Sequence, residues 1–176
     1  MSIIDAPPET PLVLDTAYFT HLRNGDKYVK NEIAKYYFHT KSFPAISSMT
    51  IFEANYGVDD QLARSKNNIE IQTIKFRQEI NNSLVNISRI LPFDQKAAEI
   101  AAYIYAHLLV HESKWLQKRR SKKKKGNREA KIWQDVFIVS TALSHNYGLA
   151  SPDTDIEVIA KYLPNEMFLR LAVWKP

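Results

Sequence analysis

The sequence contains no cysteine. This absence excludes disulfide bonds, thiolate metal sites and a cysteine nucleophile, and it is compatible with a reducing cytoplasm. No apolar run approaches the roughly twenty residues that a helix needs to cross a bilayer, so we expect no membrane association. Residues 1–10 contain two acids and two prolines but no basic residue, unlike a signal peptide. We expect them to form a flexible tail on a soluble, cytoplasmic protein.

The chain has 176 residues, which is enough for one domain with a sizeable core. Hydrophobic residues make up 45% and charged residues 24%, values that are ordinary for a soluble globular protein. We find no internal repeat and no composition shift that would mark a second domain. The sequence therefore predicts a single domain over residues 1–176.

The formal net charge of +5 is concentrated in one segment. Residues 118–131 are rich in lysine and arginine and contain one acid, Glu129, which predicts a basic loop. Such a loop can bind a phosphate backbone in a salt-dependent way, or it can simply be a solvated surface segment. Candidate RNA-binding residues within it are Lys122, Lys123, Lys124, Lys125 and Arg128.

Short apolar runs alternate with segments of helical periodicity. Leu12–Leu14, preceded by Pro11, predicts a buried parallel strand that ends at Asp15. Further strands are expected within 45–49, 85–91, 149–151 and 168–173, and helices over 27–38, 67–80, 95–110, 131–143 and 156–162. This alternation predicts an α/β fold, a three-layer α/β/α sandwich around a mainly parallel sheet of four to five strands.

Some acids at the ends of these elements have a structural explanation. Asp94 directly precedes the helix over 95–110, which predicts an N-cap. Asp15 can equally cap the helix that follows it, and Glu53 matches a capping box that begins at Thr50. Gly148 is placed as the residue that ends the helix over 131–143.

Four acids are also expected to converge. Asp15 and Asp153 each follow a predicted strand, while Glu53 and Asp135 each lie early in a helix. A carboxylate in the first helical turn is stabilised by the helix dipole. In a parallel sheet, strand ends and the helix starts that follow them share one edge, so these side chains could meet in one crevice. Carboxylates crowd together only with a cation, and hard oxygen ligands suit Mg²⁺ or Mn²⁺, which promote phosphodiester hydrolysis.

The chain resembles a known family, the PIN domains, and specifically the VapC-type toxins of bacterial toxin–antitoxin pairs. The resemblance rests on Leu-Asp-Thr at 14–16, Glu53, Leu-Pro-Phe-Asp at 91–94 and the segment from Asp135 to Leu143, and it spans about 11–174. It implies a PIN-like fold and a metal-dependent endoribonuclease that cleaves RNA and is neutralised by a cognate antitoxin. We also expect a homodimer.

By this resemblance, the metal-binding and catalytic acids would be Asp15, Glu53, Asp135 and Asp153, holding Mg²⁺ or Mn²⁺. The fourth-acid segment, 151–155, departs from the family pattern: Ser151 replaces a threonine and the usual basic residue is absent. Asp153 and Asp155 therefore compete for the fourth position. The alternative is a non-catalytic PIN-like module that binds RNA or protein, with its acids serving only as helix caps.

Overall fold

A single parallel sheet organises the chain. The computed structural model describes residues 3–116, 127–164 and 166–174, and side chains are described outside 127–131. Within these ranges six strands pair in the order β1-β6-β5-β2-β3-β4, and every pair is parallel. The strands are β1 (Ile3–Asp5), β2 (Leu12–Leu14), β3 (Ala45–Ser47), β4 (Ile90–Leu91), β5 (Gly148–Ala150) and β6 (Leu169–Ala172).

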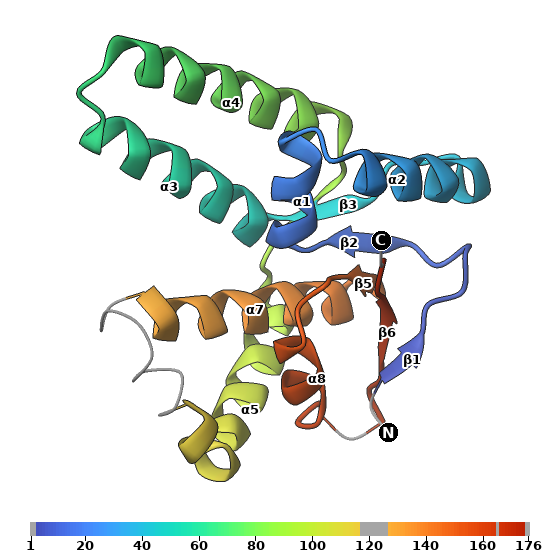
Figure 1. Cartoon of the computed structure of the whole chain (residues 1–176). Helices are drawn as coiled ribbons and strands as arrows, with labels where there is room; N and C mark the ends of the chain where they lie inside the picture. Colours follow the sequence, from blue (N-terminus) through green and yellow to red (C-terminus); the bar gives the residue numbers. More distant parts are fainter. Residues whose placement is uncertain (1–2, 117–126, 165, 175–176) are drawn as a thin grey trace.

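Helices cover both faces of this sheet (Figure 1). The three-layer α/β/α architecture is therefore confirmed, with one or two strands more than expected. One layer contains α1 (Thr16–Arg23), α2 (Lys27–Thr40), α3 (Ser48–Arg64) and α4 (Asn68–Ile87). The other contains α5 (Gln95–His111), α7 (Asn127–Ser144) and α8 (Asp155–Ala160). None of the helices in the described residues is long and apolar enough to cross a membrane.

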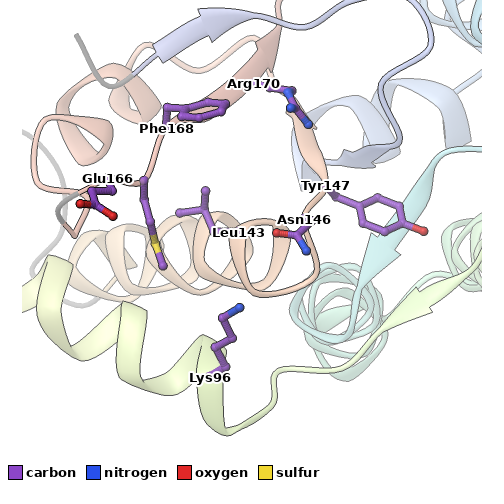
Figure 2. Close-up of a pocket in the computed structure, with 8 residues that line it drawn as sticks. Lys96, Leu143, Asn146, Tyr147, Glu166, Phe168 and Arg170 are labelled. Carbon is purple, nitrogen blue, oxygen red and sulfur yellow. The ribbon is translucent and has the colours of Figure 1, made fainter.

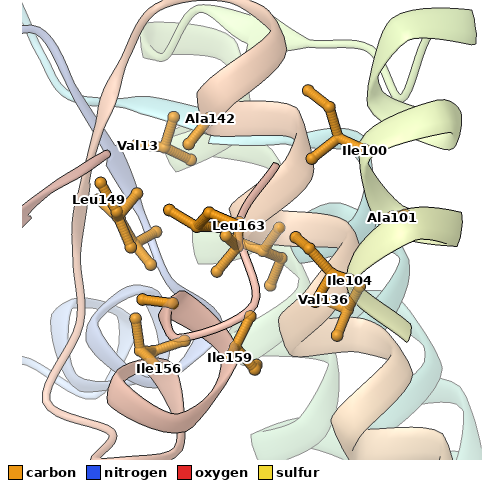
Figure 3. Packing of buried hydrophobic residues seen from close by; sticks show 14 of the residues in the cluster. Val13, Ile100, Ala101, Ile104, Val136, Ala142, Leu149, Ile156, Ile159 and Leu163 are labelled. Atoms are coloured by element: carbon orange, nitrogen blue, oxygen red, sulfur yellow. The ribbon is translucent and has the colours of Figure 1, made fainter. Parts of the chain in front are cut away.

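The alternation of side chains along β2 builds two cores. Leu12 and Leu14 pack with Phe19 of α1 in the core beneath α1, α2 and α3. Val13 points to the opposite face and packs in the core formed with α5, α7 and α8. Figure 3 shows Val13 in this second core beside Ala142 and Leu149. A three-residue strand buried on both faces thus anchors both helix layers, as its continuous apolar run predicts.

The N-terminal segment differs from the prediction of a flexible tail. Residues 3–5 form β1, which pairs with β6 at the edge of the sheet, with Ile3 opposite Leu169 and Asp5 opposite Leu171. The two prolines follow this strand instead of interrupting it, so they do not remove any of its backbone donors.

Several helix boundaries also differ. Helix α4 continues to Ile87, so the strand expected within 85–91 is reduced to Ile90–Leu91. Helix α7 begins at Asn127, inside the segment predicted as a basic loop, and the rest of that loop up to residue 126 lies outside the described residues. The basic residues did not indicate a helix start because lysine and arginine suit both solvated loops and helices.

Asp94 is confirmed as a helix cap, whereas Gly148 is not one. The Asp94 carboxylate accepts a hydrogen bond of 2.8 Å from the Ala97 amide at the start of α5. Helix α7 ends at Ser144; beyond it Asn146 has a left-handed φ of 60°, and the Tyr147 amide donates to the Ala142 carbonyl at 2.8 Å. This pairing is a Schellman motif with Asn146 in the place expected for glycine. Gly148 is instead the first residue of β5.

Candidate metal centre

A pocket of about 270 Å³ lies where β2, α3, α7 and the segment after β5 come together. All four acids that the sequence singled out line this pocket. The complete lining is Asp15, Thr16, Ala17, Thr20, His21, Glu53, Asp135 and Asp153. Asp15 and Asp153 are separated by more than a hundred positions in the chain, and the parallel sheet brings them together.

Asp15 lies directly after β2 and is 4% exposed. Its position is fixed by the sheet, because Leu14 pairs with Ala150 and the Asp15 amide donates to the Ala150 carbonyl at 3.0 Å. One carboxylate oxygen accepts from the Thr16 amide at 2.6 Å and caps α1. The other accepts from the Ser151 hydroxyl at 2.6 Å. The cap and the pocket position therefore coexist in one side chain.

Glu53 does not form the capping box that its spacing suggested. The N-cap of α3 is Ser47, whose hydroxyl oxygen accepts from the Thr50 amide at 2.9 Å. Helix α3 therefore begins earlier than expected, and Glu53 falls in its second turn. There its carboxylate accepts a hydrogen bond from the Thr16 hydroxyl. This bond connects α3 to the residue that follows Asp15.

Asp135 lies in the middle of α7 and not in its first turn. Because α7 begins at Asn127, Asp135 is more than two turns from the helix start, too far for the macrodipole to act on it. The carboxylate is 4% exposed and its chain neighbour Val136 is fully buried. A carboxylate on the buried side of an otherwise apolar helix carries a large desolvation cost unless it is compensated.

The segment after β5 is folded back on itself by two local hydrogen bonds. The Ser151 oxygen that donates to Asp15 also accepts from the Asp153 amide at 3.1 Å. The Asp153 carboxylate in turn accepts from the Asp155 amide at 3.0 Å. Asp155 is the first residue of α8 and is 2% exposed. This turn places two successive acids against α7.

Asp135, Asp153 and Asp155 form a cluster that could hold a metal ion. Each offers a carboxylate oxygen, and these oxygens lie within 4.8 Å of one another. An all-carboxylate donor set on two buried and one half-buried residue suits a hard divalent cation such as Mg²⁺ or Mn²⁺. Asp153 and Asp155, which the sequence left as alternatives, thus both contribute to the cluster.

Three pocket features escaped prediction from the sequence. Thr16 and Ser151 hold Glu53 and Asp15 in place, and a hydroxyl residue beside each acid was the available signal. His21 lines the pocket, and its Nδ1 lies 3.1 Å from the carboxylate of Asp26. His21 shows no metal-ligand spacing along α1, so nothing in the sequence indicated that it lines the pocket.

Tyr18, a buried residue of α1, has a perturbed pKa. Burial raises the pKa of Tyr18 to about 12, with a smaller contribution from the negative charge of Asp15. The phenol donates a hydrogen bond to the Trp174 carbonyl at 2.5 Å, and the two rings stack with centroids 4.9 Å apart. Tyr18 therefore stays protonated and fastens the C-terminal segment to α1.

The structure does not test the basic residues that the sequence predicts to bind RNA. Lys122, Lys123, Lys124 and Lys125 lie outside the described residues. Arg128 belongs to α7, but its side chain is outside the described part. Their role remains a prediction from the sequence.

Nearly the whole chain is similar in fold to chains of solved toxin–antitoxin complexes. A chain of VapBC2 from Rickettsia felis, bound to a DNA fragment from the promoter, matches with a TM-score of 0.62 and 21% identity, covering 93% of this chain and 98% of that one. DNA-bound VapBC from Salmonella typhimurium gives a TM-score of 0.60 and 17% identity, covering 94% and 99%. FitAcB from Neisseria gonorrhoeae gives 0.58 and 22%, covering 94% and 97%.

These similarities confirm the PIN-like, VapC-type resemblance at the level of the fold. No protein-family model matches the chain, and no curated protein matches it in sequence. At 17–22% sequence identity, these similarities show the fold and not the chemistry of the pocket.

Proposed function

We propose that this protein is a metal-dependent endoribonuclease that hydrolyses RNA phosphodiester bonds. The observation that carries the proposal is the cluster of Asp135, Asp153 and Asp155 oxygens beside a pocket that Asp15 and Glu53 also line. Acids so close together ionise jointly only when a cation offsets their repulsion. The pocket is partly open to solvent, as the entry of a substrate requires.

The carboxylates of Asp135, Asp153 and Asp155 would hold one or two Mg²⁺ or Mn²⁺ ions, with Asp15 and Glu53 completing the ligand set. Such an ion polarises a phosphodiester and lowers the pKa of a water, so no separate general base is required. The protein orients the ligands: Ser151 donates to Asp15 and Thr16 donates to Glu53. Hydrogen bonds of this kind fix the oxygen lone pairs that face a metal.

We further propose that the protein is the toxin of a type II toxin–antitoxin pair, acts in the cytoplasm as a single-domain homodimer, and is bound by a cognate antitoxin. Support comes from the fold shared with VapBC and FitAcB chains over nearly the full length. Co-purification with the product of a neighbouring reading frame, and loss of cleavage in that complex, would test the partner.

Cleavage assays on the purified chain test the nuclease activity. RNA, DNA and a small phosphoester are incubated with Mg²⁺, Mn²⁺ or EDTA, and we expect cleavage of RNA only in the presence of a metal. Asp15→Asn and Asp135→Asn should abolish it, whereas Asp94→Asn, a change in a cap that does not line the pocket, should not. Full activity in both pocket variants would refute the assignment.

The alternative is a non-catalytic module that binds RNA or protein. The hydrogen bond from the Thr16 amide to Asp15 favours it, because a helix cap without any metal makes this bond. The two readings differ in metal binding: caps give no Mn²⁺-dependent stabilisation, whereas a shared site does.

A further inference from the structure

A second pocket, of about 190 Å³, shares no lining residue with the acid-lined one. It lies between the start of α5, the end of α7 and strand β6 (Figure 2). Its lining consists of Lys96, Leu143, Asn146, Tyr147, Glu166, Met167, Phe168 and Arg170. Figure 2 shows Lys96 and Arg170 on opposite sides of the opening, with Leu143 between them.

The charges around this pocket favour an anion. Among the ion pairs of the described residues, none joins Lys96 or Arg170 to a carboxylate. Glu166 is the one acid in the lining, and its carboxylate points away from the opening in Figure 2. With Lys96 and Arg170 against Glu166, the lining carries a net positive charge.

An uncharged hydrogen-bond donor, the side-chain amide of Asn146, lies at the same opening. Asn146 holds the left-handed position that ends α7, and two backbone bonds of the Schellman motif fix its main chain there. Its amide lies at the opening between Lys96 and Arg170 in Figure 2. An amide and a guanidinium together offer the directed N–H donors that phosphate oxygens accept.

The remaining wall is apolar and partly aromatic. Leu143 and Met167 are half-buried, and the Phe168 ring is 47% exposed. The Arg170 guanidinium lies 5.5 Å from the centre of that ring. An exposed aromatic face beside a cation is the arrangement on which nucleobases stack. The cavity is too small to enclose a whole nucleotide, so part of the ligand would remain in solvent.

We propose that this pocket binds the phosphate and base of a nucleoside monophosphate, free or at the end of an RNA fragment. Lys96 and Arg170 hold the phosphate from two sides, Asn146 donates a hydrogen bond to it, and the base packs on Phe168. The site is independent of the acid-lined pocket, which would repel a phosphate when no metal is bound.

Calorimetric titration of the full chain with AMP, in EDTA and low salt, tests this site. EDTA removes any metal-dependent binding at the acids. We expect AMP to bind at least about tenfold more tightly than adenosine or inorganic phosphate, since each lacks one half of the contacts. A 5′-phosphorylated dinucleotide that binds as tightly as AMP identifies an RNA end as an equivalent source. Equal affinity for AMP and inorganic phosphate would overturn the nucleotide assignment.

Substitutions of lining residues test where AMP binds. The double variant Lys96→Gln/Arg170→Gln should weaken AMP binding at least about tenfold, whereas Lys161→Gln, an exposed lysine outside the pocket, should not. Phe168→Leu should weaken AMP but leave the affinity for phosphate unchanged. Circular dichroism melts confirm that each variant is folded. Unchanged AMP affinity in the folded double variant contradicts the proposal.

Discussion

Asp15 shows why a candidate catalytic acid is hard to separate from a helix cap. Its two carboxylate oxygens accept from different donors, the Thr16 amide and the Ser151 hydroxyl. The first bond is the cap that the sequence predicts, and the second depends on β5 lying beside β2. Only the second connects Asp15 to the segment that carries Asp153, and it could not be anticipated without the strand order.

Ser151 offers a direct test of how the pocket is held. Ser151→Ala removes the hydroxyl that donates to Asp15 and accepts from the Asp153 amide. We expect metal affinity or RNA cleavage to fall roughly 10–100-fold, the usual effect of losing a bond to a metal ligand. Ser151→Thr keeps the hydroxyl and should retain most of the activity. Equal activity in the alanine variant and the wild type would show that the bond is dispensable.

The raised pKa of Tyr18 predicts that the protein loses stability at alkaline pH. The pKa of Tyr18 is raised to about 12 by burial, whereas an unfolded tyrosine titrates near 10. Between these two pKa values, Tyr18 is already deprotonated in the unfolded chain but still protonated in the folded protein. This deprotonation lowers the free energy of the unfolded chain relative to the folded protein. The free energy of unfolding should therefore fall as pH rises from about 10 towards about 12.

Urea unfolding of the wild type and Tyr18→Phe at pH of about 8 and about 11 measures this effect. The variant loses the hydrogen bond to Trp174 at both pH values, so only the difference between them reports the titration. We expect a smaller loss between the two pH values in the variant. An identical loss would show that Tyr18 does not titrate in this way.

At the scale of elements, the caps were easier to predict than the helix lengths. Asp94 stands directly before an apolar helix and its carboxylate accepts from the Ala97 amide, so its capping role followed from the sequence. The start of α7 at Asn127 lies next to a segment too basic to indicate a boundary. The sequence therefore proposes Asp135 as a site acid but places it in the wrong turn of its helix.

Asp94→Ala should destabilise the protein without affecting its chemistry. The loss of the bond to the Ala97 amide leaves a helix donor unsatisfied, which costs about 1 kcal/mol. Asp94→Asn keeps an accepting oxygen and should unfold at nearly the wild-type urea concentration. Equal stability of the alanine and asparagine variants would mean that the cap contributes nothing.

Gly148 is required for close packing and not for a turn. A Cβ there would lie 2.9 Å from the Arg170 carbonyl oxygen and 2.9 Å from the Leu12 side chain. Gly148→Ala should therefore cost about 1–3 kcal/mol in unfolding free energy. Gly57→Ala is the matched control, because nothing lies within 4 Å of its added Cβ and α3 should gain roughly 0.5–1 kcal/mol. A Gly148→Ala variant as stable as wild type would contradict this packing.

At the scale of the whole molecule, the parallel sheet is what turns scattered acids into one pocket. The alternation of apolar runs and helices was enough to predict this architecture and the edge at which the acids meet. The pairing of β1 with β6 was missed because three residues between a terminus and two prolines carry little signal. The cluster of Asp135 with both Asp153 and Asp155 depends on a turn that only the folded chain defines.

Mn²⁺ binding, followed by isothermal titration of the wild type, Asp135→Asn and the cap variant Asp94→Asn, is the most direct test of the central claim. If carboxylates from α7 and the segment after β5 hold one cation together, wild type and Asp94→Asn should bind Mn²⁺ with the same affinity, and Asp135→Asn should lose that binding while staying folded. Equal Mn²⁺ affinity in all three proteins, or no binding in any of them, would contradict a shared metal centre.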